Sequence, residues 1–517
     1  MKPEDKKAKI YLDFVDLRDD ILNVSGYLER DENSTKIIGV HNGEEITPTS
    51  FNYETRSGEK IFNFDLKIPI ADTASKIEIK SEEGRTLPIH FRDYCNLSEF
   101  CQYYVKDGKI VYYNGSFNVE NFSYLKMIRL ELNGLIQLLK IHPAHFIQSI
   151  ILRISYILLF PFMKNKEIWL IMDRKTIADD NAEQFFRYAN AQKDDVKKLF
   201  VIHNSSNDFN RLNEEFKGKI LDCDSIKHKW YYMFCSKLIS SQGSEFDLSP
   251  FNDQQYCQMA GHCNLDFYFL QHGITLHDIS SWLVKYDRNP KLVVTSSELE
   301  NDSFLSDKYN YDENIFQILG FPRYDRLNST DEKIIAIMPT WRRNLEDENQ
   351  LINSKYFKQL NSLLNNKRLI ESAKNMDYKI IFKPHPELLP YLNCFTKNDF
   401  VEIDEIHKYH EIINKSSILV TDYSSVAFDF AYLKKPIIYY HYPDDDFHYN
   451  TEASYFKYDT MGFGELFDNE EDLIGKVIYY MDNDACMEEE YQKRVDEFFK
   501  FNDHDNSERC YEAIRKN

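Results

Sequence analysis

The chain has 517 residues and a mass of 61.6 kDa, enough for three or four domains of ordinary size. Hydrophobic residues make up 43% and charged residues 28%, which excludes a wholly disordered chain. The formal net charge is -21, whereas a diffuse DNA or RNA binder needs a positive surface, so we expect no nucleic acid partner.

The cysteines and the first residues bear on the compartment. There are nine cysteines, and no two of them have the CxxC spacing of a zinc site, so we expect no metal. Their odd number favours free thiols in a reducing cytosol. The opening sequence MKPEDKKAKI lacks an apolar core, so we expect no signal peptide.

Residues 1–118 are predicted to form a small β-rich domain. Alternating polar and apolar residues, as in KAKIYLDFVDL and KIFNFDLKIPI, are typical of half-buried strands. A small β-sandwich that contacts substrate and a plain structural appendage both fit this sequence.

Residues 119–166 are predicted to be helical and to differ in charge from the rest. The window 121–166 has a net charge of +5, so the remaining chain carries -26. Its charged residues are Lys126, Arg129, Glu131, Lys140, Arg153, Lys164 and Lys166. Residues 146–163 are almost wholly apolar, but Arg153 and Pro161 argue against a membrane span. A buried core helix and a helix in the interface of an anionic bilayer both fit, and the positive charge favours the bilayer.

From residue 167 onward, short apolar strands alternate with helices, which predicts parallel sheets covered on both faces. The first series of strands is expected at 168–172, 199–203, 237–240, 267–270, 292–295 and 316–319. The second series is expected at 334–338, 379–382, 417–421 and 436–440. The two series predict two doubly wound α/β domains, 167–328 and 329–517, with a cleft between them.

Polar clusters follow several of these strands, although the usual nucleotide loops GxGxxG and GxxxxGK[ST] are absent from the sequence. Open α/β sheets bind ligands at the carboxyl ends of their strands. The clusters are QHG (271–273), GFPRYD (320–325), MPTWR (338–342), KPHP (383–386) and TDYSS (421–425).

Each cluster has a functional and a structural interpretation. His272 suits a general base, although a loop histidine bonded to the backbone is the favoured interpretation of that cluster. Arg323 and Arg342 suit phosphate, whereas pairing with a carboxylate is a strong alternative in so acidic a chain. His385, held between two prolines and near Lys383, favours function.

The TDYSS turn precedes a predicted helix. Backbone N–H groups and hydroxyls at such a turn can bind an anion. Simple N-capping by Ser424 or Ser425 is the alternative, and both can hold at once.

Together and in this order, the clusters resemble the CDP-glycerol glycerophosphotransferase family, which includes the teichoic acid polymerases and primases of bacterial envelopes. The resemblance covers about residues 167–517. Its most specific parts are QHGITLHDI (271–279), GFPRYD (320–325), MPTWR (338–342), FKPHPE (382–387) and TDYSSVAFDFAYLKKPIIYY (421–440). IWLIMDRKTIADDNAEQFFRYA (168–189) and NDHDNSER (502–509) are also similar. Two departures, Gln271 for Trp and His504 for Gly, concern the donor polyol and the acceptor more than the reaction type.

The resemblance implies a GT-B-like pair of Rossmann-like domains that face each other across a cleft, with CDP bound by the second. It implies transfer of glycerol phosphate or ribitol phosphate from a CDP carrier to a hydroxyl of a lipid-linked acceptor, releasing CMP, in teichoic acid or capsule synthesis. The CDP-polyol is a substrate, and no cofactor is required. The protein would act as a peripheral protein on the cytoplasmic face of the bacterial membrane, and a homo-oligomer stays open.

The resemblance also implies residue roles. His272 is the expected base, and His385 is the second catalytic residue, at the pyrophosphate. The expected nucleotide and phosphate contacts are Arg323, Arg342, Lys383, Thr421, Asp422, Ser424, Ser425 and Arg509. A GT-B glycosyltransferase that uses CMP-sialic acid is the alternative, because such enzymes also pair a His-Pro with a Ser-Ser motif. A membrane-bound assembly factor on a dead transferase fold is disfavoured, because both histidines are intact.

Overall fold

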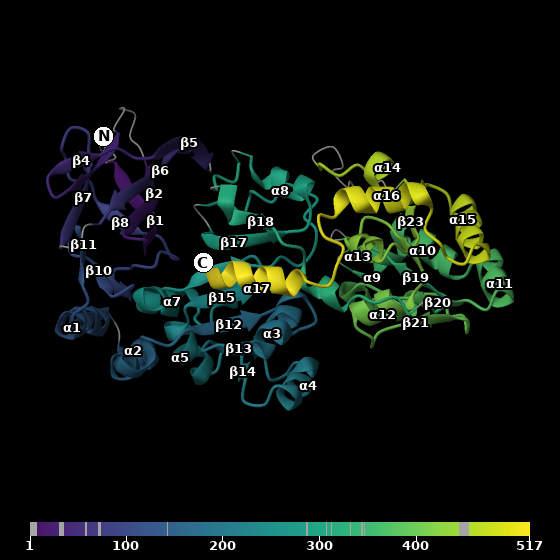
Figure 1. The fold of residues 1–517 in the computed structure, drawn as a ribbon, viewed down its shortest axis with the longest axis horizontal. Helices are drawn as coiled ribbons and strands as arrows, with labels where there is room; N and C mark the ends of the chain where they lie inside the picture. Colours follow the sequence, from purple (N-terminus) through teal and green to yellow (C-terminus); the bar gives the residue numbers. More distant parts are fainter. Residues whose placement is uncertain are drawn as a thin grey trace. The chain divides into compact units, whose positions relative to one another are not determined.

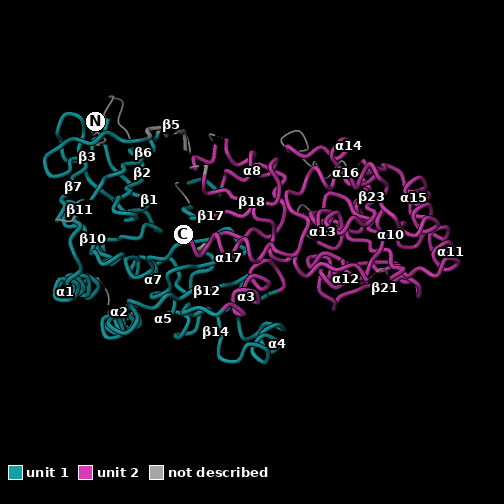
Figure 2. The backbone as a smooth tube through the Cα atoms, viewed as in Figure 1, with its two compact units in different colours: residues 1–178, 193–268, 282–291 teal, residues 179–192, 269–281, 292–517 magenta. Residues whose placement is uncertain are grey.

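The computed structural model describes residues 8–29, 36–56, 59–70, 74–141, 143–285, 288–306, 308–311, 313–330, 332–342, 345, 347–443 and 454–516 (Figure 1). The chain divides into two units that do not follow residue order (Figure 2). Unit 1 comprises residues 1–178, 193–268 and 282–291, and unit 2 comprises residues 179–192, 269–281 and 292–517.

The N-terminal part of unit 1 is built from strands, as predicted. These are β1 (Lys9–Arg18), β2 (Ile21–Glu29), β3 (Ile37–His41), β4 (Glu44–Ile46), β5 (Ser50–Arg56), β6 (Glu59–Pro69), β7 (Ser75–Ser81), β8 (Ile89–Phe91), β9 (Tyr103–Lys106), β10 (Lys109–Tyr113) and β11 (Phe117–Asn121). They form a five-stranded sheet in the order β5-β6-β2-β1-β8 and a six-stranded sheet in the order β4-β3-β7-β11-β10-β9. Apolar side chains from both sheets, such as Leu12, Val24, Ile77 and Val119, share one buried core. The prediction of a small β-rich domain is therefore confirmed.

Two helices follow, α1 (Tyr124–Ile141) and α2 (Pro143–Met163). One side of these two helices is buried and contains an ion pair. Arg153 of α2 donates from Nε to Glu131 of α1 at 2.5 Å, and neither side chain is exposed. Tyr103 donates to the same carboxylate at 2.7 Å, and Nη1 of Arg153 donates to the carbonyl of Phe100 at 2.9 Å. Removing one partner of a buried ion pair lowers the free energy of unfolding by about 3–5 kcal/mol. This network therefore holds both helices against the N-terminal sheets.

The other side of the helix pair is apolar and open to solvent. Large apolar side chains that are 45–81% exposed are Leu125, Leu132, Ile136 and Leu139 of α1 and Ile147, Ile151, Ile154, Leu158 and Phe162 of α2. We call these nine residues the apolar face. Arg129, Lys140, Lys164 and Lys166 are exposed on the same helices or just after them. Phe146–Met163 is long and apolar enough to cross a membrane by length and composition, and 33% of that window is buried.

The rest of unit 1 contains parallel strands with helical connections. The strands are β12 (Ile168–Met172), β13 (Lys197–Ile202), β14 (Ile220–Asp222), β15 (Lys237–Ser240) and β16 (Asp266–Phe269), adjacent in the order β14-β13-β12-β15-β16. The other elements are α4 (Asn207–Glu215), α5 (Ile226–Phe234), α6 (Glu245–Leu248), α7 (Asp253–Met259) and the 3-10 turn η1 (Ala260–His262). Every residue of the IWLIM strand β12 is buried, as expected for a parallel strand covered on both faces.

Unit 2 begins with elements that come from separate parts of the chain. These are α3 (Asn181–Ala191), β17 (Pro290–Thr295), α8 (Glu298–Phe304), η2 (Glu313–Ile315), β18 (Phe316–Ile318) and η3 (Pro322–Arg326). Strand β17 pairs in parallel with β18. Helix α3 packs against η3 and against the distant helix α17 (Asn506–Lys516).

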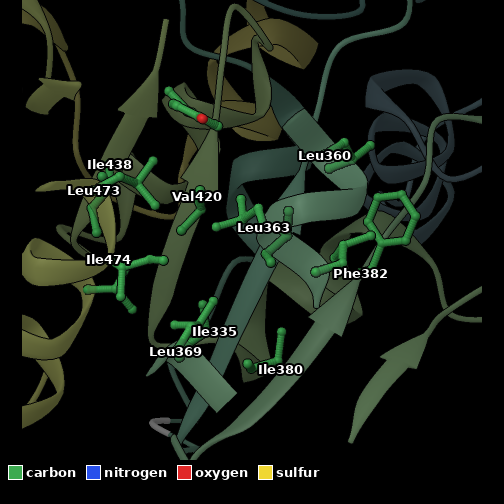
Figure 3. Packing of buried hydrophobic residues seen from close by; sticks show 14 of the residues in the cluster. Ile335, Leu360, Leu363, Leu369, Ile380, Phe382, Val420, Ile438, Leu473 and Ile474 are labelled. Carbon is green, nitrogen blue, oxygen red and sulfur yellow. The ribbon is translucent and has the colours of Figure 1, made fainter. Parts of the chain in front are cut away.

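The second sheet lies wholly in unit 2 and has six parallel strands. They are β19 (Ile334–Met338), β20 (Lys379–Phe382), β21 (Val401–Ile403), β22 (Ile418–Thr421), β23 (Ile437–Tyr440) and β24 (Gly464–Phe467), in the order β21-β20-β19-β22-β23-β24. The connecting elements are α9 (Glu348–Asn353), α10 (Lys355–Leu364), α11 (Lys367–Asn375), η4 (Pro386–Cys394), α12 (Tyr409–Lys415), α13 (Val426–Tyr432), α14 (Tyr458–Met461), α15 (Glu470–Asp482) and α16 (Glu489–Phe498). Figure 3 shows how Leu360 and Leu363 of α10 and Ile474 of α15 pack with strand residues such as Ile335 and Val420.

All ten strands predicted from the apolar runs form, most of them within one or two residues of the expected bounds. The sequence analysis missed β14, β21 and β24, which are three or four residues long and each contain an acidic residue. The nine cysteines are free thiols, as expected. Two series of parallel strands are thus confirmed, and the boundaries of the domains stay predictions.

Candidate functional site

The order of the second sheet reverses beside its first strand. From β19 the chain moves outward through β20 and β21, and then returns to place β22 on the other side of β19. Ligands of open α/β sheets bind at the carboxyl ends of the two strands where the order reverses. Those ends carry the MPTWR and TDYSS segments, so the topology brings these two predicted clusters together.

Asp422 and Arg342 connect the two loops. Asp422 accepts from the Thr340 N–H at 2.7 Å and pairs with Nη1 of Arg342 at 2.8 Å. Both side chains are buried, and the guanidinium also lies 4.8 Å from the centre of the Tyr356 ring. Burial would lower the pKa of Arg342, but Asp422 raises it overall, so the guanidinium stays charged. The hydroxyl of Thr421 donates to the Met338 carbonyl at 2.6 Å. These three predicted phosphate contacts therefore brace the loops.

Lys383 is similarly placed beside β20. Its ammonium lies 3.1 Å from Asp404, donates to the carbonyl of His407 at 2.5 Å, and is 7% exposed. The KPHP segment is held in place by this pair. A direct contact with a phosphate would require the ammonium to leave Asp404.

Arg323 joins three segments that are far apart in sequence. Nε and Nη2 donate to the two carboxylate oxygens of Asp429 at 2.8 and 3.0 Å, in a bidentate pair with α13. Nη1 donates to Asp180 at 3.1 Å and to the backbone carbonyl of His272 at 2.5 Å. Burial would lower the pKa of Arg323, but the two carboxylates raise it overall. Arg323 thus clamps the His272 loop beside the TDYSS turn.

Arg509 braces the turn that precedes η3. It donates to both oxygens of Asp503 at 2.9 Å and to the Leu319 carbonyl at 2.8 Å. Asp325 of the GFPRYD segment in turn accepts from the N–H groups of Asn506 and Ser507 at the start of α17, at 2.9 and 2.7 Å. The two segments that resembled the family are therefore in contact with each other.

The remaining predicted residues present polar groups at the surface. His272 and Ser425 are exposed, and Ser424 is half-buried. A Cβ placed on Gly273 would lie 3.4 Å from Oγ of Ser425, so the His-Gly loop lies against the start of α13. Within the described residues, the Ser425 side chain makes no capping hydrogen bond to its helix. Its hydroxyl is therefore not used by a cap.

His385 has a defined orientation. Its Nδ1 accepts from the N–H of Glu387 at 3.3 Å, and Pro386 follows it at the first position of η4. An imidazole that accepts at Nδ1 carries its proton on Nε2 when neutral. The half-buried ring can therefore donate a hydrogen bond from Nε2.

The sequence analysis missed the acidic partners of the site cations. Asp429 lies in the VAFDFAY segment and Asp180 in the IADDNAEQ segment. Both segments resemble the family, but neither aspartate was assigned a role. It also missed His441, which stacks on Tyr423 with ring centres 3.9 Å apart and whose Nε2 lies 3.1 Å from the Asp422 carbonyl. Burial lowers the pKa of His441. The sequence contains only a weak indication of these residues, because each is a polar residue that follows a predicted strand or lies near the start of a predicted helix.

One group in unit 1 has donor types that could hold a metal ion. Donor atoms of Cys223, Asp224 and His228 lie within 4.8 Å of one another. However, His228 Nδ1 already accepts from the Asp224 N–H at 3.1 Å, and burial raises the pKa of the Cys223 thiol to about 12. The geometry favours a hydrogen-bonded turn between β14 and α5.

Comparisons with known proteins support the resemblance. The model of the family described as CDP-Glycerol:Poly(glycerophosphate) glycerophosphotransferase matches residues 152–516. The minor teichoic acid biosynthesis protein GgaB of Bacillus subtilis (strain 168) is 37% identical over 483 residues, which is 88% of this chain and 53% of that protein. The teichoic acid poly(glycerol phosphate) polymerase of Bacillus spizizenii is 30% identical over 189 residues, which is 36% of this chain and 45% of that protein. The chain thus spans about half the length of these curated relatives.

Among solved structures, a variant of the wall teichoic acid polymerase TagF superposes with a TM-score of 0.53 at 17% identity. The match covers 72% of this chain and 96% of that chain. A second TagF variant, soaked with CDPG, gives a TM-score of 0.53 at 18% identity over 68% of this chain and 88% of that chain. At such identity the likeness concerns the fold.

Proposed function

Because this chain belongs to the CDP-glycerol:poly(glycerophosphate) glycerophosphotransferase family, we propose that it transfers a polyol phosphate, glycerol phosphate or ribitol phosphate, from a CDP carrier to a hydroxyl of a lipid-linked acceptor. The product polymer is of the teichoic acid or capsule type. The observation that carries the proposal is the placement of the His272–Gly273 loop against Ser425, where the order of the second sheet reverses.

In the proposed reaction, the acceptor hydroxyl attacks the β-phosphorus of the CDP-polyol. A new O–P bond forms, the bond between the β-phosphorus and the bridging oxygen breaks, and CMP leaves with that oxygen. His272 takes the proton of the attacking hydroxyl, since a neutral imidazole has a usual pKa of ~6.5. His385 donates from Nε2 to a phosphate oxygen, and the hydroxyls of Ser424 and Ser425 hold the pyrophosphate.

The cations serve this site indirectly. Arg323, Arg342, Lys383 and Arg509 each lie against a carboxylate, so their charges are neutralised within the protein. We therefore propose that these four cations, together with Thr421 and Asp422, hold the loops in place and do not contact the nucleotide directly. Preorganised loops lower the barrier because the reacting groups need no rearrangement.

The apolar face is proposed to lie on an anionic bilayer, as the lipid-linked acceptor requires. The buried side of the helix pair packs on the rest of unit 1 through Arg153 and Glu131. The nine apolar side chains of the apolar face lie on the other side and stay exposed. Each exposed cation near an anionic surface adds about 1 kcal/mol. The protein would then be peripheral on the cytoplasmic face of the membrane, with α2 lying on the bilayer.

The proposal is tested by incubating the full chain and a lipid-linked glycerol phosphate acceptor in micelles with CDP-glycerol, CDP-ribitol or CMP-sialic acid. We expect CMP release and acceptor extension with one of the CDP-polyols. Release from CMP-sialic acid instead would identify a glycosyltransferase. No release from either CDP-polyol, by a chain that binds CDP, would overturn the proposed donor.

A further inference from the structure

A buried carboxylate lies directly behind the His272 loop. Glu300 of α8 is fully buried, and its Oε1 accepts from the backbone N–H of Thr275 at 2.8 Å. Its Oε2 accepts from the N–H of Ser296, at the end of β17, at 2.9 Å. A buried carboxylate is costly unless it is fully hydrogen-bonded. Here its two oxygens join the loop to the strand.

The contact to Thr275 goes beyond ordinary helix capping. Ser297 and Glu300 have the spacing of a capping box, and the Ser297 hydroxyl does accept from the Glu300 N–H at 3.1 Å. In such a box the glutamate serves backbone N–H groups at the start of its own helix. Oε1 of Glu300 serves a loop that lies 25 residues earlier. Burial raises the pKa of Glu300 to about 7, although the N–H groups of Thr275 and Ser296 lower it.

The residue before His272 is fixed by the same network. Gln271 has a left-handed φ of 59°, which is uncommon for a residue with a side chain. Its amide donates to the Val294 carbonyl at 2.8 Å and to Glu300 at 3.3 Å, and accepts from the Thr275 hydroxyl at 2.7 Å. Its carbonyl accepts from Asn181 at 2.7 Å. Strain of this kind persists when the surroundings hold it in place.

We propose that Glu300 is a positioning residue that sets the orientation of His272 through Gln271 and Thr275. Arg323 fixes the carbonyl of His272 from one side, and the Glu300 network fixes the preceding backbone from the other. The exposed imidazole thus projects from a backbone that is held at both ends. The inference rests on the proposed role of His272 as the base.

The kinetic test uses Glu300→Gln, which keeps the shape but supplies one oxygen where two accept. The matched control is Glu298→Gln on the same helix, whose side chain is 66% exposed and pairs with Lys500. We expect Glu300→Gln to lower kcat about 10- to 100-fold, as for a small misplacement of a catalytic group, with CDP affinity changed less than about twofold. Glu298→Gln is expected to leave both unchanged. An unchanged kcat for Glu300→Gln would overturn the inference.

A double-mutant cycle separates positioning from general stability. If Glu300 acts through His272, adding Glu300→Gln to His272→Ala lowers the residual rate no further. An equal fractional loss in both backgrounds would contradict the inference. Thr275→Val, which removes only the hydroxyl bond to Gln271, provides a milder second variant and is expected to show the same dependence on His272.

Hydrogen exchange of the full chain tests the contact without any turnover. Loss of the Glu300 bond is expected to speed exchange of the Thr275 amide in a peptide covering 271–281, in Glu300→Gln but not in Glu298→Gln. Exchange that does not change would overturn the inference even if the wild-type chain releases CMP. Absence of CMP release by the wild type, with exchange altered as expected, would instead place the failure in the proposed function.

Discussion

The strand-end loops of unit 2 and the helix pair of unit 1 both carry several cations, and they use them in opposite ways. In the loops, Arg323, Arg342, Lys383 and Arg509 lie against carboxylates and are largely withdrawn from water. On α1, α2 and the residues after them, most cations are exposed beside apolar side chains. A position at the end of a strand is therefore not enough to assign a basic residue to phosphate binding. Its ionic partner and its exposure to solvent must also be known.

The largest effect on turnover should come from His272, which belongs neither to the cations paired with carboxylates nor to the helix pair. His272→Ala is expected to lower turnover ~100- to 10,000-fold, because a general base is lost, while CDP affinity stays nearly intact. His277→Ala, in the same loop and also exposed, is the matched control and should keep its rate. His385→Ala should lower turnover and also weaken CDP. Turnover by His272→Ala above about a tenth of the wild-type rate would exclude His272 as the base.

The next prediction separates a brace from a ligand contact. Arg342→Ala leaves Asp422 buried without its partner, so the free energy of unfolding should fall by about 3–5 kcal/mol. Urea unfolding followed by fluorescence measures this, with exposed Arg129→Ala as the control that should change stability by less than ~0.5 kcal/mol. Unchanged stability together with lost CDP binding would show instead that Arg342 is a phosphate contact.

The exposed cations of the helix pair are expected to act on membrane affinity and leave stability nearly unchanged. Replacing Lys164 and Lys166 by Glu should weaken binding to vesicles with anionic lipid about 30-fold or more, at ~1 kcal/mol per cation, and less at high salt. Co-sedimentation with vesicles measures the affinity. Replacing exposed Lys493 and Lys516 by Glu changes the net charge equally, so an equal loss in that control would contradict a localised contact.

The smallest of these effects tests the hydroxyls of the TDYSS turn. Replacing Ser424 and Ser425 together by Ala should weaken CDP about tenfold, since two hydrogen bonds are lost at ~0.5–1.5 kcal/mol each. The melting temperature should change little, because Ser425 is exposed and Ser424 accepts at 3.4 Å from Val426. Calorimetry that shows the same CDP affinity in the double variant would remove the turn from the nucleotide site.

Apolar periodicity predicted the parallel strands well because most of them are nearly continuous buried runs, as in IWLIM. The three missed strands are too short and too acidic for that signal. The helix pair could not be settled from sequence, since Arg153 and Glu131 cancel each other only once α1 and α2 pack together. One side of α2 is buried, as the core interpretation expects, and the other side is exposed, so contact with a bilayer stays a proposal.

The roles of the site cations depended on contacts that no local pattern reveals. Arg323 and Asp429 are 106 residues apart, and Arg342 and Asp422 are 80 positions apart, so their pairing follows from the order of the strands. The acidic composition did make such pairing a strong alternative. The histidines and serines differ from these cations because the structure leaves them exposed or half-buried at the surface.

Unit 2 draws its parts from three stretches of the chain, and this limits how the chain can be truncated. The bond from Asn506 to Asp325 spans 181 residues, and Arg323 reaches back 143 residues to Asp180. A fragment that starts at residue 292 contains the whole second sheet but lacks Asp180, Asn181 and Glu300's partners Gln271 and Thr275. Such a fragment would keep Arg323 but lack two of its partners, the Asp180 carboxylate and the His272 carbonyl. Contacts between segments this far apart in sequence form slowly, so the packing of α3 and α17 against η3 should be among the last steps of refolding.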